Sequence, residues 1–265
     1  MVVDPTPNTS LGQHWLNDTN VLEDIVQEAH LQPNDNVLEI GPGPGALTKV
    51  LLDDQIVVTA VEFDVQLAKL LVKRFNSNRL KVIQQDILKF NLTSLSTDYT
   101  VVANIPYYLT SKLVRILCES ANPPKTAVLL VQTEVAQRIA AKPGAMSVLS
   151  VSAQVFNTVR LGRIVQPELF TPPPKVDSQV VILERRIKPY VPKEQLFVFF
   201  QIVKAGFSER RKKLRSSLSG GLHIEKTQAD QLLQKAGIAA SARAQELSLD
   251  DWLALVNAYI NYVKK

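Results

Sequence analysis

Three polar side chains each follow a short apolar run of the sequence, and their types could hold a small ligand. Glu62 and Asp86 are carboxylates, and Asn104 carries an amide. At the end of a strand in an α/β sheet, one carboxylate can accept hydrogen bonds from both hydroxyls of a ribose, and another can accept from an amino group. Because such sheets bind ligands at the carboxyl ends of their strands, these three residues are candidates for a single site.

The segment GPGPG (41–45) lies between another apolar run and a stretch of helical periodicity. Gly41 and Gly43 allow a tight turn and the close approach of a ligand, and the N-terminus of the following helix offers unpaired N–H groups. The spacing differs from the G-x-G-x-x-G of dinucleotide sites. Pro42 and Pro44 also lack the N–H groups that a pyrophosphate would use. The segment therefore favours a cofactor without phosphates.

The elements that must position these residues alternate along the chain. From about residue 20 to residue 185, apolar runs alternate with helix-period segments, which predicts an α/β domain with a largely parallel sheet. We expect a capping box at Asn20 and Glu23 to begin the first helix. Its apolar face consists of Leu22, Ile25, Val26 and Ala29. The predicted strands are 36–40, 56–61, 80–85, 100–103, 125–132, 151–156 and 178–185.

A change in composition after Arg186 predicts a domain boundary. The segment IKPYVPKEQ (187–195) places two prolines in a linker-like stretch. We therefore predict one domain at 1–187 and a second at 188–265. Apolar residues at helical spacing predict that the second is small and all-helical. These residues are Phe197, Phe200, Val203, Phe207, Leu232, Leu233, Trp252, Leu255, Val256 and Tyr259.

Positive charge is concentrated in one region. The net charge is +5, yet residues 184–226 alone contain 11 Lys and Arg against 4 Glu, a local balance of +7. A cationic surface of this kind predicts a polyanionic partner, most simply nucleic acid. Apolar residues within the densest cluster predict a helix that packs on one side and is basic on the other. The basic residues of this cluster are Arg210, Arg211, Lys212, Lys213 and Arg215.

The totals exclude several classes of protein. The chain has 265 residues, 46% of them hydrophobic and 21% charged, as is ordinary for a globular protein. It has no uninterrupted apolar stretch of about 18 residues, and its first residues lack the regions of a signal peptide. We therefore expect a cytoplasmic protein without a membrane partner. Cys118 is the only cysteine and the three histidines are scattered, so we expect neither a disulfide framework nor a metal site.

Seven segments together resemble one family. The arrangement of GPGPG, VEFD (61–64), QQD (84–86) and NIPY (104–107) resembles class I S-adenosylmethionine-dependent methyltransferases, and specifically the ribosomal RNA adenine N6-dimethyltransferases. Three further segments are similar to the N-terminal motif, the proline-rich loop and the basic helix of that family. They are LGQHWLND (11–18), FTPPPKVDS (170–178) and FSERRKKLRSSL (207–218). The resemblance implies a Rossmann-like, seven-stranded α/β domain followed by the small helical domain.

The resemblance also assigns the cofactor and the residues that would hold it. S-adenosylmethionine is the implied cofactor. His14 and Trp15 stand where the family commonly has Asn and Phe, and we expect them to keep the role of that motif. The implied cofactor-binding residues are His14, Leu16, Gly41, Gly43, Glu62, Asp86, Ile87 and Asn104.

The segment NIPY would carry the chemistry. In such enzymes the Asn104 side-chain carbonyl and the Ile105 backbone carbonyl would accept the two hydrogens of the adenine N6 amine, while Pro106 stiffens the loop. Tyr107 would stack on one face of the base and Phe170 on the other. Tyr108 is interpreted as a core aromatic residue. The basic cluster would bind RNA phosphates.

The resemblance therefore predicts an enzyme that dimethylates N6 of two adjacent adenines near the 3′ end of small-subunit rRNA during ribosome biogenesis. The expected partner is an immature ribosomal subunit, and we expect the enzyme to act as a monomer. One alternative is a ribosome assembly factor that binds RNA with catalysis secondary or lost. Others are a large-subunit rRNA adenine methyltransferase that confers antibiotic resistance and, disfavoured by the glycine spacing, a dinucleotide-dependent oxidoreductase.

Overall fold

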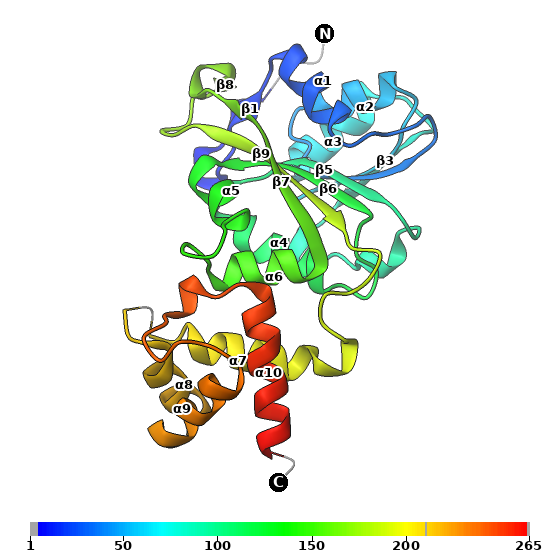
Figure 1. Cartoon of the computed structure of the whole chain (residues 1–265). Coiled ribbons are helices and arrows are strands. Elements are labelled where there is room, and N and C mark those ends of the chain that lie inside the picture. The colour runs from blue at the N-terminus through cyan, green and yellow to red at the C-terminus, as the bar shows by residue number, and fades with distance from the viewer. Residues whose placement is uncertain (1–4, 210, 264–265) are drawn as a thin grey trace. The chain divides into compact units, whose positions relative to one another are not determined.

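The computed structural model describes residues 5–209 and 211–263 and divides into two compact units (Figure 1). Unit 1 comprises Met1–Gln137 and Asn157–Arg185, and unit 2 comprises Arg138–Phe156 and Arg186–Lys265. Unit 2 therefore includes residues 138–156, which precede the boundary at 187 and 188 suggested by composition.

Unit 1 contains a seven-stranded sheet with the strand order β4-β3-β2-β5-β6-β9-β7. Its first five strands in this order are parallel, and β9 runs antiparallel to both β6 and β7. This architecture confirms the predicted Rossmann-like α/β class. The strands are β2 (Asn36–Ile40), β3 (Val57–Glu62), β4 (Leu80–Gln84), β5 (Thr100–Asn104), β6 (Thr126–Gln132), β7 (Asn157–Val165) and β9 (Ser178–Arg185).

The chain changes direction across the sheet between β2 and β5. It runs from β2 outward to β3 and β4, and then returns to form β5 on the other side of β2. Open α/β sheets bind ligands at such a switch point, outside the carboxyl ends of the strands. The three polar residues predicted to form a site lie at or just beyond the ends of β3, β4 and β5.

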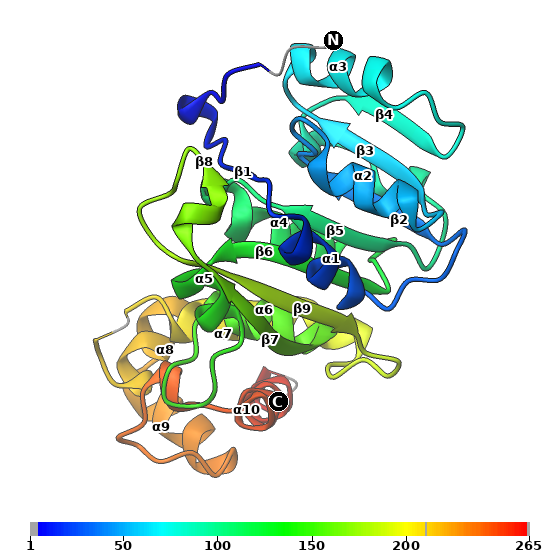
Figure 2. The same cartoon turned by 90° about the horizontal axis from the view of Figure 1, so that it is seen from above.

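Helices cover both faces of this sheet. Side chains of α1 and α2 share a buried cluster with one face, and α4 lies on the opposite face (Figure 2). The apolar face predicted for α1 is buried as expected. The helices of unit 1 are α1 (Thr19–Gln27), α2 (Ala46–Asp53), α3 (Val65–Arg74) and α4 (Thr110–Glu119), and α5 (Thr133–Ile139) begins in unit 1 and ends in unit 2.

The predicted start of α1 is wrong by two residues. Asp18, and not Asn20, is the N-cap, because its side chain accepts a hydrogen bond from the Val21 backbone N–H at 3.0 Å. Asp and Asn are about equally good N-cap residues. The Leu22 N–H also donates to the Asp18 carbonyl at 3.1 Å, so Asn20 already lies within the first turn of the helix.

Residues 151–156 form a helix and not the predicted strand. They belong to α6 (Val148–Phe156), whose side chains from Ser150 to Ala153 are all buried. When nearly every residue of a segment is buried, hydrophobic periodicity cannot distinguish a strand from a helix. The strand that completes the sheet is β7, which follows directly and was not predicted.

Short elements complete unit 1. Near the N-terminus, β1 (Trp15–Leu16) pairs antiparallel with β8 (Phe170–Thr171), which brings Leu16 opposite Phe170. The described chain also contains the 3-10 helices η1 (Thr9–Leu11), η2 (Ile87–Lys89), η3 (Leu92–Ser94), η4 (Tyr107–Leu109), η5 (Pro167–Leu169), η6 (Lys193–Gln195) and η7 (Ala244–Glu246).

Unit 2 is helical and has its own core. Besides α6 it contains α7 (Leu196–Gly206), α8 (Leu214–Leu222), α9 (Lys226–Lys235) and α10 (Leu249–Val263). Its largest fully buried side chains are Trp252 and Phe199. The prediction that Phe197 faces the core is wrong, because Phe197 is 81% exposed. Residues 199, 202 and 203 form the buried face, so Phe197, two positions before Phe199, points away from it.

The basic cluster does not form the predicted single helix. α7 ends at Gly206 and α8 begins at Leu214, so Arg211, Lys212 and Lys213 lie in the connection between them. Leu214 is fully buried and its backbone N–H donates to the Ala242 carbonyl at 2.8 Å. The extended backbone of Lys213 brings Leu214 to that position. Arg210 lies outside the described residues.

Candidate active site

The glycine loop turns sharply after β2 and leads directly into α2. Gly41, Gly43 and Gly45 all have positive φ, which glycine adopts without steric cost. A Cβ atom at Gly43 would lie 3.2 Å from the indole ring of Trp15, whereas one at Gly41 would meet only Pro106, at 3.9 Å. The loop is therefore packed closely at Gly43 and leaves space above Gly41, where a ligand can approach the backbone.

Glu62 joins the glycine loop to the end of β3. Its Oε2 accepts a hydrogen bond from the Gly43 backbone N–H at 3.1 Å, and its Oε1 accepts from the Asp64 N–H at 2.8 Å. The side chain is buried, and burial raises the pKa of its carboxyl while these backbone bonds lower it. A carboxylate has about four acceptor positions. Each oxygen can therefore still accept one hydroxyl donor.

Asp86 follows β4 and caps the short helix η2. Its Oδ1 accepts a hydrogen bond from the Leu88 backbone N–H at 2.9 Å. Ile87 beside it is buried and lines the same pocket. The cap fixes the orientation of the carboxylate and leaves acceptor capacity for an amino group at the pocket.

Asn104 ends β5 and faces the N-terminal segment. Its Nδ2 donates to the backbone carbonyl of His14 at 3.1 Å. This bond fixes which end of the amide is the donor, so Oδ1 is available as an acceptor. The next residue, Ile105, is held by a backbone hydrogen bond to Leu130 and is buried.

Tyr107 is fixed by contacts on two sides. Its hydroxyl lies 2.8 Å from Oγ of Ser178, a fully buried residue at the start of β9. Its ring stacks on His14, with centroids 5.9 Å apart, and Nδ1 of His14 donates to the Pro172 carbonyl at 2.7 Å. Burial raises the pKa of the Tyr107 phenol. NIPY, the N-terminal motif and the proline-rich loop therefore meet at one tyrosine.

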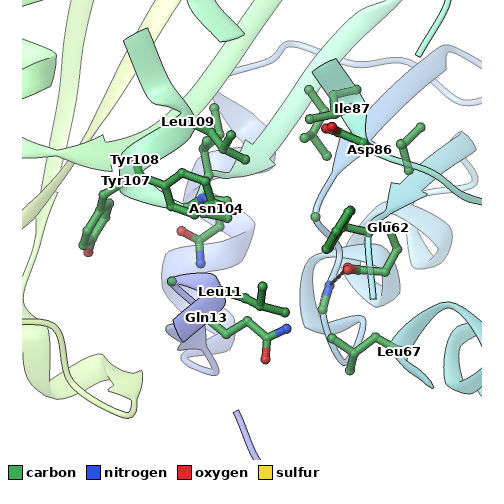
Figure 3. Close-up of a pocket in the computed structure, with 18 of the residues that line it drawn as sticks. Leu11, Gln13, Glu62, Leu67, Asp86, Ile87, Asn104, Tyr107, Tyr108 and Leu109 are labelled. Carbon is green, nitrogen blue, oxygen red and sulfur yellow. Dashed lines mark hydrogen bonds between the residues drawn. The ribbon is translucent and has the colours of Figure 1, made fainter. Parts of the chain in front are cut away.

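One pocket of about 250 Å³ collects most of the predicted site residues. Asn104, Tyr107 and Tyr108 lie on one side of it, and Glu62, Asp86 and Ile87 on the other (Figure 3). Its volume is close to the lower end of the range for small-molecule sites, about 300 to 1,000 Å³. The predicted residues that line it are His14, Gly41, Gly43, Glu62, Asp86, Ile87, Asn104, Ile105, Pro106 and Tyr107.

Two of the residues predicted to bind the cofactor or the target base do not line this pocket. Leu16 and Phe170 face each other across the β1–β8 pair, each 3% exposed, and belong to the hydrophobic cluster of unit 1. The stacking role of Phe170 stays a prediction that requires its ring to leave this cluster. The interpretation of Tyr108 as a core residue is wrong, because the residue is 67% exposed and lines the pocket.

Several residues of the site were not predicted from the sequence. Leu11, Gln13 and Leu67 also line the pocket, from the N-terminal segment and from α3 (Figure 3). Gln13 could have been found, because it belongs to the quoted motif LGQHWLND. Leu67 could not, because an apolar residue on an amphipathic helix gives no sign that it borders a ligand.

The described basic residues in unit 2 differ in their surroundings. Lys212 forms an ion pair with Glu209, and Arg215 forms one with Asp230 of α9 at 3.1 Å. Arg211 and Lys213 are exposed in the connection before α8. Arg211 and Lys213 are therefore the described members of the cluster that are most open to a polyanion.

The pocket fits the donor and acceptor groups of a nucleoside cofactor without phosphates. The carboxylates of Glu62 and Asp86 line the pocket, and they can accept hydrogen bonds from the hydroxyl and amino groups of such a cofactor. The turn at Gly41 leaves open space beside the backbone. Among the residues that the structure describes, no group of three His, Cys, Asp or Glu could hold a metal ion.

A seven-stranded sheet with this order, and a pocket at its switch point built from these residues, define a class I methyltransferase that uses S-adenosylmethionine. The sequence profile of the family described as "Ribosomal RNA adenine dimethylase" matches residues 5–261. The chain belongs to that family and is an rRNA adenine dimethyltransferase.

Similar proteins span almost the whole chain. "Ribosomal RNA small subunit methyltransferase A" of Thermosynechococcus vestitus is 43% identical over 92% of this chain and 93% of its own length. The protein of that name from Streptococcus thermophilus is 37% identical over 94% of this chain and 90% of its own length. Among solved structures, a dimethyladenosine transferase from Plasmodium falciparum has a TM-score of 0.80 at 26% identity, covering 94% of this chain and 98% of that one. The 23S rRNA methyltransferase ErmE has a TM-score of 0.75 at 29% identity, and the match covers 92% of this chain and 98% of ErmE.

No helix within residues 5–209 and 211–263 is long and apolar enough to cross a membrane.

Proposed function

We propose that this chain dimethylates the N6 amine of two adjacent adenines near the 3′ end of small-subunit rRNA. The observation that carries this proposal is the pocket that joins Glu62 and Asp86 to the NIPY segment. The choice of small-subunit RNA rests on the relatives named for that subunit, which are 36 to 43% identical over most of the chain.

Residues at the ends of β3 and β4 bind the cofactor, and residues at the end of β5 bind the target base. Glu62 accepts from the ribose hydroxyls and Asp86 from the adenine amino group of the cofactor. The turn at Gly41 lets the amino-acid part of the cofactor lie against the backbone, and Gly43 allows the turn to pack against Trp15. When bound, S-adenosylmethionine supplies an electrophilic methyl group on a sulfonium. His14 from the N-terminal segment and Asn104 from β5 border the same space, and the Asn104 amide donates a hydrogen bond to the His14 carbonyl.

Asn104 and Ile105 orient the nucleophile. The lone pair of an exocyclic adenine amine is delocalised into the ring, so the amine attacks well only when it is positioned. Oδ1 of Asn104 and the carbonyl of Ile105 accept the two N6 hydrogens and direct the lone pair toward the methyl group. Such orientation contributes several kcal/mol and, in ideal cases, about 7 to 11.

Tyr107 holds the target base. Stacking on an aromatic ring contributes roughly 1 to 3 kcal/mol per base, and the Tyr107 ring is already oriented by Ser178 and His14. The base reaches the pocket from a single-stranded segment or after leaving its stack.

The basic connection between α7 and α8 binds the RNA backbone. Arg211 and Lys213 meet phosphates directly, and Lys212 and Arg215 do so from their ion-paired positions. Arg210 is assigned the same role from the sequence. The enzyme acts as a monomer on an immature small subunit, in the cytoplasm where that particle assembles.

The test offers two substrates to one enzyme. Immature small subunits that lack the modification and protein-free 23S rRNA are incubated separately with labelled S-adenosylmethionine. We expect transfer to the small subunits alone. The likeness to ErmE makes the reverse preference the specific outcome that would overturn the assignment of substrate.

An Asn104→Ala variant tests the assignment of catalysis. We expect kcat/KM to fall on the order of 100-fold, as when other positioned hydrogen-bonding groups are removed from active sites. The matched control is Asn78→Ala, which truncates an exposed asparagine away from the pocket. Full activity of Asn104→Ala would remove Asn104 from the mechanism.

A further inference from the structure

A second, much smaller cavity lies behind the glycine loop. Its volume is about 30 Å³, and it shares Trp15, Gly41 and Asn104 as walls with the cofactor pocket. Leu22 and Leu47 close it from α1 and α2, and the carboxyl of Glu39 lines it from β2. A cavity needs about 10 to 15 Å³ of such space to hold one water molecule, so this one is large enough.

Glu39 is an acidic residue inside a buried strand. It is 1% exposed, and its Oε2 accepts a hydrogen bond from the Thr48 hydroxyl at 2.7 Å. Its other oxygen, Oε1, is buried and has no hydrogen-bond partner among the described residues. Leaving such a buried group unsatisfied costs about 1 to 3 kcal/mol.

Trp15, which also lines this cavity, carries a second unsatisfied polar atom. Its indole Nε1 is buried and donates to no acceptor in the described part of the chain. Trp15 also packs against Gly43, at 3.2 Å from a Cβ position there.

We propose that Glu39 and Trp15 share one ordered water molecule in this cavity, and that Glu39 is thereby a positioning residue for the glycine loop. The water accepts from the indole N–H and bonds to Oε1, which satisfies both groups. Through it, Glu39 fixes the Trp15 ring and hence the wall of the pocket at Gly43. This role rests on the assignment of the larger pocket to the cofactor.

The protonation state of Glu39 is compatible with a hydrogen bond to a water molecule in this cavity. Burial raises the pKa of Glu39 to about 8, the nearby Glu62 adds to the rise, and the bond from Thr48 opposes it. Among the residues that line the cavity, Glu39 is the one titratable group within the described chain. Near pH 7 the neutral carboxyl predominates, so it can donate to the water, and the carboxylate formed at higher pH accepts from it.

The first test follows the indole N–H resonances by NMR in the full-length protein without cofactor. The chain has two tryptophans, so a Trp15→Phe variant assigns both signals. We expect the Trp15 indole to show a cross-peak to a bound water and to shift with pH around a midpoint near 8. Glu39→Gln should abolish the shift, and the Trp252 signal should stay constant as an internal control. Absence of the water cross-peak, or a shift that persists in Glu39→Gln, would overturn the proposal.

The second test measures S-adenosylmethionine binding by calorimetry at pH 7. We expect Trp15→Phe to raise Kd about 3- to 10-fold, because it loses one hydrogen bond to the water. Glu39→Gln keeps a neutral polar group and should bind within about 2-fold of wild type, whereas Glu39→Ala should weaken binding like Trp15→Phe. Equal affinity in all four proteins would overturn the positioning role.

A crystal structure with and without the cofactor distinguishes the occupants of the cavity. We expect the same solvent molecule beside Oε1 and Nε1 in both states. A dry cavity, or the amino group of the cofactor in its place, would contradict the proposal. These outcomes do not depend on RNA methylation, so failure of the proposed substrate and failure of the water site are separately recognisable.

Discussion

Glu39 lies in strand β2 between two aliphatic residues, and its burial links protonation to stability. The folded pKa, about 8, is above the ordinary value of 4.5. Between these values the folded chain keeps a proton that the unfolded chain has lost. The free energy of unfolding therefore falls as pH rises through this window, by at most about 1.4 kcal/mol per pH unit.

A Glu39→Gln variant should remove this dependence on pH. We expect its Tm to match that of wild type near pH 5, where both side chains are neutral, and to exceed it at pH 9. Thermal unfolding at several pH values, followed by circular dichroism, measures the difference. Parallel curves for the two proteins from pH 5 to 9 would show that Glu39 has an ordinary pKa.

Ser178 should act through Tyr107. Removing its hydroxyl in Ser178→Ala releases the Tyr107 hydroxyl from the bond of 2.8 Å without touching the cofactor pocket. We expect kcat to fall about 3- to 10-fold with the Kd of S-adenosylmethionine unchanged. Steady-state kinetics and calorimetry provide the two values.

The double variant of these residues separates positioning from general damage. Tyr107→Phe also loses the bond, so we expect Ser178→Ala combined with Tyr107→Phe to be no slower than Tyr107→Phe alone. Additive losses would mean that Ser178 affects catalysis by another route.

At the scale of elements, α7 and α8 cross with their backbones in close contact. A Cβ at Gly221 would lie 2.6 Å from Cα of Ala205, whereas the neighbouring Gly220 has nothing within 4 Å. We expect Gly221→Ala to destabilise unit 2 by about 1 to 3 kcal/mol. Gly220→Ala, its control in the same helix, should be neutral or stabilising by up to about 1 kcal/mol. Urea unfolding measures both, and equal effects would contradict the close crossing.

The connection between α7 and α8 should control RNA affinity and leave cofactor binding unchanged. We expect the double variant Arg211→Glu with Lys213→Glu to bind RNA more weakly. The slope of log K against the logarithm of salt concentration should become shallower by about 2. Lys235→Glu, an exposed charge on α9, is the matched control. Filter binding at several salt concentrations gives the slopes. An equal loss of cofactor affinity would instead indicate a structural role for the connection.

Elements with strong local signals were predicted well. β2, β6 and β9 are short apolar runs, and their predicted bounds agree with the structure to within one residue. α6 was mistaken for a strand because burial on all sides removes periodicity. The basic connection was mistaken for a helix because the contact of Leu214 with Ala242 is between distant residues and leaves no local signal.

For the whole molecule, sequence reasoning predicted the class of site better than its details. Glu62, Asp86 and Asn104 were placed together correctly because parallel strands end at one edge of a sheet. The burial of Leu16 and Phe170 depends on the pairing of β1 with β8, across more than 150 residues of sequence, which local patterns do not reveal. Glu39 in β2 was also not predicted to have a role, although a carboxylate within an apolar run of the sequence is an unusual feature that could have indicated one.

The most direct test of the central claim is mass spectrometry of rRNA after incubation of the protein with S-adenosylmethionine and immature small subunits that lack the modification. We predict N6,N6-dimethyladenosine at two adjacent positions near the 3′ end, and much slower formation with Asn104→Ala. If the relative from Thermosynechococcus vestitus formed this nucleoside on the same particles and the present protein did not, the claim would be contradicted.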